Sequence, residues 1–231
     1  MTQERFSTIQ QRALERKGGK DNLNKLLSSP LSKDQIADIT EDRWLAGFSL
    51  KVFQSGIRWD VVRKKWPAFE EVFFKFNPDS LLLLSDEQWE SKAQDPRIIR
   101  HLTKVMSIPH NAQMIVEARR EHGSFSEMIA NWPSDSISEL WLYLKKHGKR
   151  LGGNTGPYSL RQMGVDTFLL TSDIEAYLRN TDIINTSSVS KKTLISINQA
   201  FTEWQQQSGL PFTQISQIIA YSVGDNTRFA Q

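Results

Sequence analysis

The chain has 231 residues, with 39% hydrophobic and 24% charged residues, as in an ordinary soluble protein of one large domain or two small ones. The absence of cysteine excludes disulfides, thiolate nucleophiles and cysteine-held zinc. The four histidines lack the spacing of a compact ligand set, and no phosphate-binding glycine motif occurs, so we expect no metal and no cofactor. A net charge of +3 permits a nucleic-acid partner without requiring one.

Membrane and secretory segments are not recognisable. Met1–Gln11 is polar, and the apolar run Leu81–Leu84 is far shorter than the ~20 residues of a membrane span. We therefore expect a cytoplasmic protein with no membrane partner.

Residues 1–30 are polar and basic. Such a segment is most often a solvated helix or arm, although it could also serve a partner. We therefore divide the chain into a basic N-terminal arm or helix at 1–30 and a helical domain at 31–231.

Helical periodicity follows through the rest of the chain. Helix starts are indicated by four Ser-x-x-Glu/Gln capping boxes, and apolar stripes recur at helical spacing. No convincing alternating stretch is present, and a Thr/Asn/Ser-rich loop is expected at 181–190, before a helix from Lys191. The fold class predicted is all-α. The boxes begin at Ser32, Ser85, Ser124 and Ser136, and the stripes are Phe69/Val72/Phe73/Phe76, Leu194/Ile197/Phe201/Trp204 and Ile215/Ile218/Ile219.

The segment 144–180 is the most informative part. Basic residues, including Lys149 and Arg150, precede a glycine turn, Gly152–Tyr158. A glycine turn between helices can present backbone N–H groups to a DNA phosphate, and lysines add attraction that is independent of sequence. Glycine-rich clusters are also common in ordinary loops. From spacing alone, both interpretations stay open.

The region 44–179 resembles the 3-methyladenine DNA glycosylase I family, and its hairpin region resembles that of the helix-hairpin-helix glycosylase superfamily. The matching blocks are Gly56-Ile57-Arg58-Trp59, then Ile98-Ile99-Arg100-His101-x-x-Lys104-Val105 with Asn111-Ala112, and finally Leu144-Lys145-Lys146 leading to Gly153-x-Thr155-x-x-Tyr158-Ser159. The resemblance implies a helix-hairpin-helix glycosylase-like bundle with extra terminal helices. It also implies a monomer that acts on double-stranded DNA containing a damaged base.

The implied activity is excision of an alkylated purine, chiefly 3-methyladenine, by base flipping and hydrolysis of the N-glycosidic bond in base-excision repair. The enzyme would be monofunctional, because the hairpin Gly152–Ser159 contains no lysine to attack the sugar. The residues that the resemblance places in a base pocket are Lys51, Phe53, Gln54, Trp59, Tyr158 and Trp44. Those that it places on DNA are Lys104, Asn111, Lys149, Arg150, Gly153, Asn154, Thr155 and Gly156.

Three departures from the family pattern matter. The family's N-terminal aromatic motif is not recognisable, although Trp44 could supply a stacking face. The family's zinc-binding cysteines are missing, and we expect the terminal helices to pack together in place of that site. Lys51 stands where the family has a base-contacting glutamate. A lysine accepts no hydrogen bond and repels a cationic purine.

Asp173 is the candidate catalytic residue. The stretch 166–173 resembles the superfamily segment that carries the catalytic aspartate, whose charge would stabilise a cationic sugar or orient water. The competing interpretation is that Asp173 is a helix N-cap. For Trp59, likewise, stacking on a base competes with simple core packing.

Two other kinds of function stay open. One is a non-catalytic helix-hairpin-helix DNA-binding protein that has lost the base pocket, which the lysine at 51 favours. The other is a shared fold with a different partner altogether.

Overall fold

The computed structural model describes residues 3–185 and 190–223, and these residues form helices and connecting segments without a strand. The all-α prediction is confirmed. The expected loop at 181–190 falls partly outside the described residues, at 186–189. None of the described helices is long and apolar enough to cross a membrane.

The chain divides into two compact units. The first consists of residues 1–30, 133–138 and 166–231, and the second of residues 31–132 and 139–165. Residue 30, the expected boundary of the N-terminal arm, is also a boundary between units. A separate role for residues 1–30 stays a prediction.

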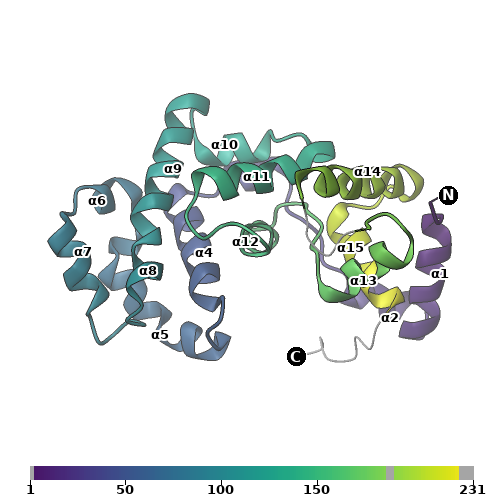
Figure 1. Cartoon of the computed structure of the whole chain (residues 1–231), viewed down its shortest axis with the longest axis horizontal. Coiled ribbons are helices and arrows are strands. Elements are labelled where there is room, and N and C mark those ends of the chain that lie inside the picture. Colours follow the sequence, from purple (N-terminus) through teal and green to yellow (C-terminus); the bar gives the residue numbers. More distant parts are fainter. Residues whose placement is uncertain (1–2, 186–189, 224–231) are drawn as a thin grey trace. The chain divides into compact units, whose positions relative to one another are not determined.

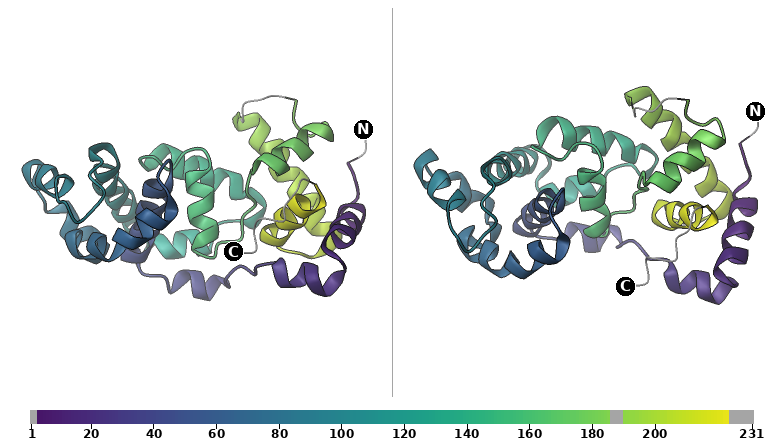
Figure 2. Two further views of the ribbon diagram at one scale, coloured as in Figure 1. Left: turned by 90° about the horizontal axis from the view of Figure 1, so that it is seen from below. Right: turned by 60° about the horizontal axis from the view of Figure 1, so that its bottom comes forward.

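The first unit is built from the terminal helices (Figures 1 and 2). Its core contains Phe168, Phe201 and Phe212, whose rings contact one another at centroid distances of 4.3–6.0 Å. The predicted apolar stripes from Leu194 and Ile215 are buried here. The elements are α1 (Phe6–Lys17), α2 (Lys20–Leu26), the 3-10 helix η2 (Ser134–Ser136), α13 (Ser172–Asn180), α14 (Lys191–Ser208) and α15 (Phe212–Ser222).

Helix α1 is fixed against this unit rather than extended as a free arm. Phe6, Ile9 and Ala13 are fully buried, and α1 lies beside α15 and α14 (Figure 2). Glu4 also accepts hydrogen bonds from Arg12 and from the hydroxyl of Tyr177 on α13, both at 2.7 Å. The expected packing of the terminal helices on one another is confirmed.

The second unit holds an aromatic core. Trp44, Phe48 and Phe125 contact one another at 5.6–5.9 Å, and the predicted stripe from Phe69 to Phe76 is buried. The helices are α3 (Lys33–Ala37), α4 (Glu41–Gln54), α5 (Trp59–Val72), α6 (Pro78–Leu82), α7 (Asp86–Ala93), α8 (Leu102–Val105), α9 (Ser107–His122), α10 (Phe125–Ala130), most of α11 (Ile137–His147) and α12 (Thr155–Gln162), with the 3-10 helix η1 (Phe74–Phe76).

Local sequence signals set several of these helix starts. Ser32 and Ser85 form complete capping boxes with Gln35 and Gln88, as predicted. Ser124 accepts from the backbone N–H three residues on, and Ser136 directly precedes α11. Together these caps fix where the chain turns into each helix, and so the order of helices around the core.

Candidate functional site

A cavity of about 180 Å³ lies in the second unit, where the end of α4 meets the starts of α5 and α12. We call it the α4–α12 pocket. Four residues predicted from the sequence for a base pocket come together in it, with two predicted DNA contacts and Ser55, which sequence reasoning missed. The lining residues are Lys51, Gln54, Ser55, Trp59, Asn154, Thr155 and Tyr158.

Lys51 and Trp59 face each other in this pocket. The Lys51 ammonium nitrogen lies 4.7 Å from the centre of the Trp59 ring, and Trp59 is 50% exposed. Trp59 is therefore not a core residue. Burial, with a smaller contribution from the charge of Arg63, lowers the pKa of Lys51. None of the described residues that line the pocket is acidic, so Lys51 brings a positive charge that no lining carboxylate balances.

Gln54 supplies the opposite kind of polar group. It is 5% exposed, and its amide oxygen makes no hydrogen bond to any residue in the described part of the chain. A buried acceptor without a partner costs about 1–3 kcal/mol, so a donor on a bound molecule would be favoured here. Gln54 follows Lys51 by three residues, which places both side chains on one side of α4.

Tyr158 contributes a hydroxyl from α12. The side chain is half-buried, and that burial raises the pKa of Tyr158. The hydroxyl therefore stays protonated in neutral solution and can donate to a bound molecule.

The glycine turn is shorter than expected, because α12 already begins at Thr155. Gly153 is exposed and has a left-handed backbone (φ +58°), which glycine adopts without strain. Its N–H donates to no acceptor in the described part of the chain and is open to an anion. Lys149 and Arg150 are exposed beside the turn, as predicted.

Lys104, in contrast, is not a surface phosphate contact. It is 4% exposed, and its ammonium donates to the carbonyls of Phe53, at 3.2 Å, and Ser55. These carbonyls lie at the C-terminal end of α4, where a cation is favoured by the helix dipole. Lys104 therefore holds the helix end that carries Gln54.

Asn111 and Gly156 are also structural. Asn111 is fully buried; its amide oxygen accepts from the backbone N–H of Lys149 at 2.7 Å, and its amide nitrogen donates to the Lys149 carbonyl at 3.3 Å. A Cβ on Gly156 would lie 2.5 Å from the carbonyl oxygen of Leu151, so only glycine fits there. Both residues are buried and shape the hairpin from inside.

The prediction that Trp44 and Phe53 line the base pocket is not supported by their placement. Both side chains are fully buried. Trp44 donates its indole N–H to Ser126 at 2.8 Å, and Phe53 packs edge-on against Phe69 at 4.6 Å. Phe53 is buried because it lies on the opposite side of α4 from Lys51. Trp44 lies on the same side as Lys51 but two turns earlier in α4, where it packs against Phe125.

Asp173 lies in the first unit, as the second residue of α13, and is partly exposed. The N-cap of this helix is Thr171, whose hydroxyl accepts from the backbone N–H of Ile174 at 3.3 Å. The capping interpretation of Asp173 is therefore wrong, and its carboxylate is available for another role.

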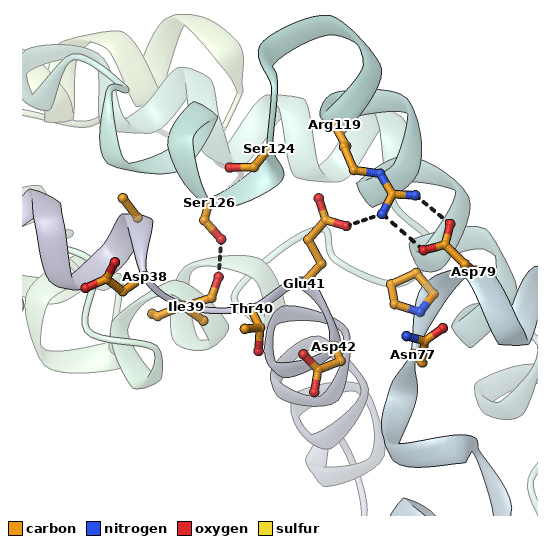
Figure 3. Close-up of a pocket in the computed structure, with 12 residues that line it drawn as sticks. Asp38, Ile39, Thr40, Glu41, Asp42, Asn77, Asp79, Arg119, Ser124 and Ser126 are labelled. Carbon is orange, nitrogen blue, oxygen red and sulfur yellow. Dashed lines mark hydrogen bonds and ion pairs between the residues drawn. The ribbon is translucent and has the colours of Figure 1, made fainter.

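A second hollow, of about 330 Å³, lies elsewhere in the second unit (Figure 3). Its central charges are paired, because Arg119 lies 3.0 Å from Glu41 and 2.5 Å from Asp79. Ser126 donates to the carbonyl of Ile39. This network joins α4, α6 and α9 and explains the polar lining without a ligand.

Comparison with known proteins identifies the family. A family model described as methyladenine glycosylase matches residues 37–162, which include every residue lining the α4–α12 pocket. This chain belongs to the methyladenine glycosylase family. The family predicted from the sequence is thus confirmed, and with it a place among the DNA glycosylases. DNA-3-methyladenine glycosylase 1 of Escherichia coli strain K12 is 26% identical over 130 residues, covering 47% of this chain and 68% of that protein.

Solved structures show the same fold. A mutant of 3-methyladenine DNA glycosylase I from Staphylococcus aureus is 22% identical, with a TM-score of 0.51 over 64% of this chain and 89% of that chain. The 8-oxoguanine glycosylase/lyase of Methanocaldococcus jannaschii, solved with DNA containing 8-oxoguanine, is 14% identical, with a TM-score of 0.51 over 93% of this chain and 96% of that chain. The helical glycosylase fold therefore extends through the terminal helices.

Within the described residues, no group of three or more His, Asp or Glu side chains could hold a metal ion.

Proposed function

We propose that this methyladenine glycosylase family member is a monofunctional DNA N-glycosylase that receives a damaged base, flipped from duplex DNA, in the α4–α12 pocket. The observation that carries the proposal is the convergence of Lys51, Gln54, Trp59 and Tyr158 on one cavity beside the hairpin. Trp59 offers an aromatic surface for stacking, and the polar groups offer hydrogen bonds to a base edge. The family makes an alkylated purine, with 3-methyladenine first, the substrate to assay.

The hairpin would hold the DNA backbone. The exposed Gly153 N–H can donate to a phosphate, and Lys149 and Arg150 add positive charge next to it. Asn111 fixes the backbone of Lys149 through two hydrogen bonds, so these groups are preorganised. Contacts of this kind position the protein without reading sequence, which suits a protein that must find one lesion in any context.

The reaction is hydrolysis at the anomeric carbon of the nucleotide. The C1′–N bond breaks with its electron pair on the base, and the hydroxyl of one water bonds to C1′. A cationic alkylated purine leaves as a neutral base, and the proton of that water passes to the solvent; an uncharged base leaves with negative charge and takes up that proton. Asp173 would stabilise the cationic sugar or orient the water. No lysine occurs between Gly152 and Ser159, so we expect no covalent enzyme–sugar intermediate from the hairpin.

A non-catalytic DNA-binding relative is the alternative that Lys51 favours. Loss of the pocket is the premise of that alternative. The pocket is present, however, with an aromatic side chain half-exposed and a buried acceptor unpartnered. These features lower the stability of the empty protein, so binding of a ligand that covers the ring and donates to the acceptor is favoured.

The test is to incubate the protein with methylated duplex DNA and to quantify the released bases by mass, beside Asp173→Asn and the matched control Asp182→Asn. Asp182 is exposed and in the same unit. We expect release that Asp173→Asn loses and Asp182→Asn retains. Base release by Asp173→Asn would support the glycosylase activity but would contradict the catalytic role of Asp173. Binding without release from any damaged DNA would favour the non-catalytic alternative, and a borohydride-trapped covalent complex would contradict monofunctional hydrolysis.

A further inference from the structure

The α4–α12 pocket is lined by a donor and an acceptor that both come from α4. Lys51 can only donate, and its charge has no lining carboxylate to balance it. The Gln54 amide oxygen can only accept, and it is unpartnered in the described structure. Both side chains come from one side of α4, three residues apart.

A cationic alkylated purine fits this arrangement less well than an uncharged base. Its positive charge would enter a pocket that already holds the Lys51 ammonium. Transfer of two like charges into a partly desolvated site is unfavourable. The ring of 3-methyladenine also offers no carbonyl oxygen to Lys51.

We propose that this pocket selects an uncharged damaged base whose edge carries a ring carbonyl next to a ring N–H, as in hypoxanthine, 8-oxoguanine or uracil. The carbonyl accepts from the Lys51 ammonium, the N–H donates to the Gln54 amide oxygen, and the ring stacks on Trp59. This inference rests on the proposed glycosylase function and specifies its substrate class.

The same contact assists departure of an uncharged base. Such a base leaves less readily than a cationic purine, because negative charge develops on it as the C1′–N bond breaks. An ammonium group at the carbonyl stabilises that charge in the transition state. Lys51 thus compensates for the weaker leaving group, while water supplies the hydroxyl to C1′ and the proton to the base, as in the hydrolysis above.

The base also changes the surroundings of Lys51. In the empty pocket the ammonium contacts the Trp59 ring at 4.7 Å. A base that stacks on this ring takes the place of the ammonium, which must then move to the edge of the base. The carbonyl therefore replaces the aromatic ring as the partner of the charge.

The experiment compares single-turnover release from duplexes that contain hypoxanthine, 8-oxoguanine, uracil or 3-methyladenine, with spontaneous loss subtracted. The variants are Gln54→Leu, which removes the acceptor, and Lys51→Glu, which replaces the cation with an acceptor. The matched control is Lys92→Gln, because the Lys92 ammonium also contacts an aromatic ring, Phe74, at 4.2 Å but lies outside the pocket. Thermal shift with the free bases gives a second readout that needs no catalysis, because a ligand that binds the folded state raises its stability.

We expect at least one carbonyl-bearing base to be released ten or more times faster than 3-methyladenine. Gln54→Leu should lower that rate at least tenfold, Lys51→Glu should shift the preference toward 3-methyladenine, and Lys92→Gln should leave it unchanged. Release of 3-methyladenine alone would overturn this inference and preserve the proposed function. The inference would also be overturned if both pocket variants still released a carbonyl-bearing base, or still showed a thermal shift with it, as the unmodified protein does. Release of no base by the folded protein would overturn both.

Discussion

The Lys51 ammonium lies 4.7 Å from the ring centre of Trp59, and the two residues stand at the end of α4 and the start of α5. This pairing places a cation against the exposed aromatic ring that lines the pocket. It ties the charge of the pocket to its stacking surface, so that a ligand has to engage both.

Removal of the stacking surface should reduce excision without loss of the fold. Trp59→Ala is expected to slow base release roughly 5- to 150-fold, since stacking on an aromatic side chain contributes about 1–3 kcal/mol per base. Phe74→Ala is the matched control, because Phe74 is 46% exposed and also contacts an ammonium, yet lies outside the pocket. Equal losses in both variants would contradict a role for Trp59 in base binding.

Loss of the buried amide at Asn111 should loosen the hairpin. Asn111→Ala leaves the Lys149 N–H and carbonyl without their partners, so the free energy of unfolding should fall by about 1–3 kcal/mol. DNA affinity should fall with it, as measured by fluorescence anisotropy beside thermal unfolding. The control is Gln113→Ala, whose side chain is exposed on the same helix. Unchanged stability in Asn111→Ala would show that the hairpin is held by other contacts.

The exposed charge at Lys149 should appear in the salt dependence of DNA binding. Lys149→Gln is expected to make the slope of log affinity against log salt shallower by about 1, because one phosphate contact is lost. Lys33→Gln, on exposed α3, should leave the slope unchanged. A slope that is the same in both variants would place the DNA away from the hairpin.

The acid stability of the first unit should depend on Glu4. The hydrogen bond from Arg12 lowers the pKa of Glu4, and the Tyr177 hydroxyl adds to the effect. The carboxylate therefore stabilises the fold above its unfolded pKa near 4.5, and this contribution disappears as pH falls through the lower folded value.

Glu4→Gln should accordingly lower the melting temperature at neutral pH by about 2–4 °C, for a loss of about 1 kcal/mol in a partly exposed pair. The difference from the unmodified chain should shrink at low pH. Thermal unfolding between pH 3 and pH 7, with exposed Glu90→Gln as the control, measures it. A difference that does not vary with pH would mean that the charge of Glu4 is not the stabilising feature.

Part of the pocket follows from local order, because Lys51, Gln54 and Trp59 surround one helix–turn–helix junction. Tyr158 reaches the pocket only because α12 packs on α4, a long-range contact that the family resemblance supplied. The capping boxes and apolar stripes likewise act over a few residues, so their helices formed as predicted.

The errors came from contacts over long sequence distances. Lys104 and Asn111 have polar side chains that usually face water, and their burial depends on carbonyls 51 and 38 residues away. No local sequence pattern predicts such partners. The predicted pocket positions of Trp44 and Phe53 were not supported for a related reason. Their burial depends on Phe125 and Phe69, which come from other helices.

The two units are interleaved along the chain, which passes from one to the other at residues 30–31, 132–133, 138–139 and 165–166. During synthesis, the segments of the pocket-bearing unit have all been made by residue 165, while α1 waits for α14 and α15 to cover Phe6 and Ile9. Phe6 and Ile9 therefore leave the ribosome well before the helices that bury them. A chain cut short after residue 165 would contain every residue that lines the α4–α12 pocket, would lack Asp173, and would leave the apolar side of α1 without its cover.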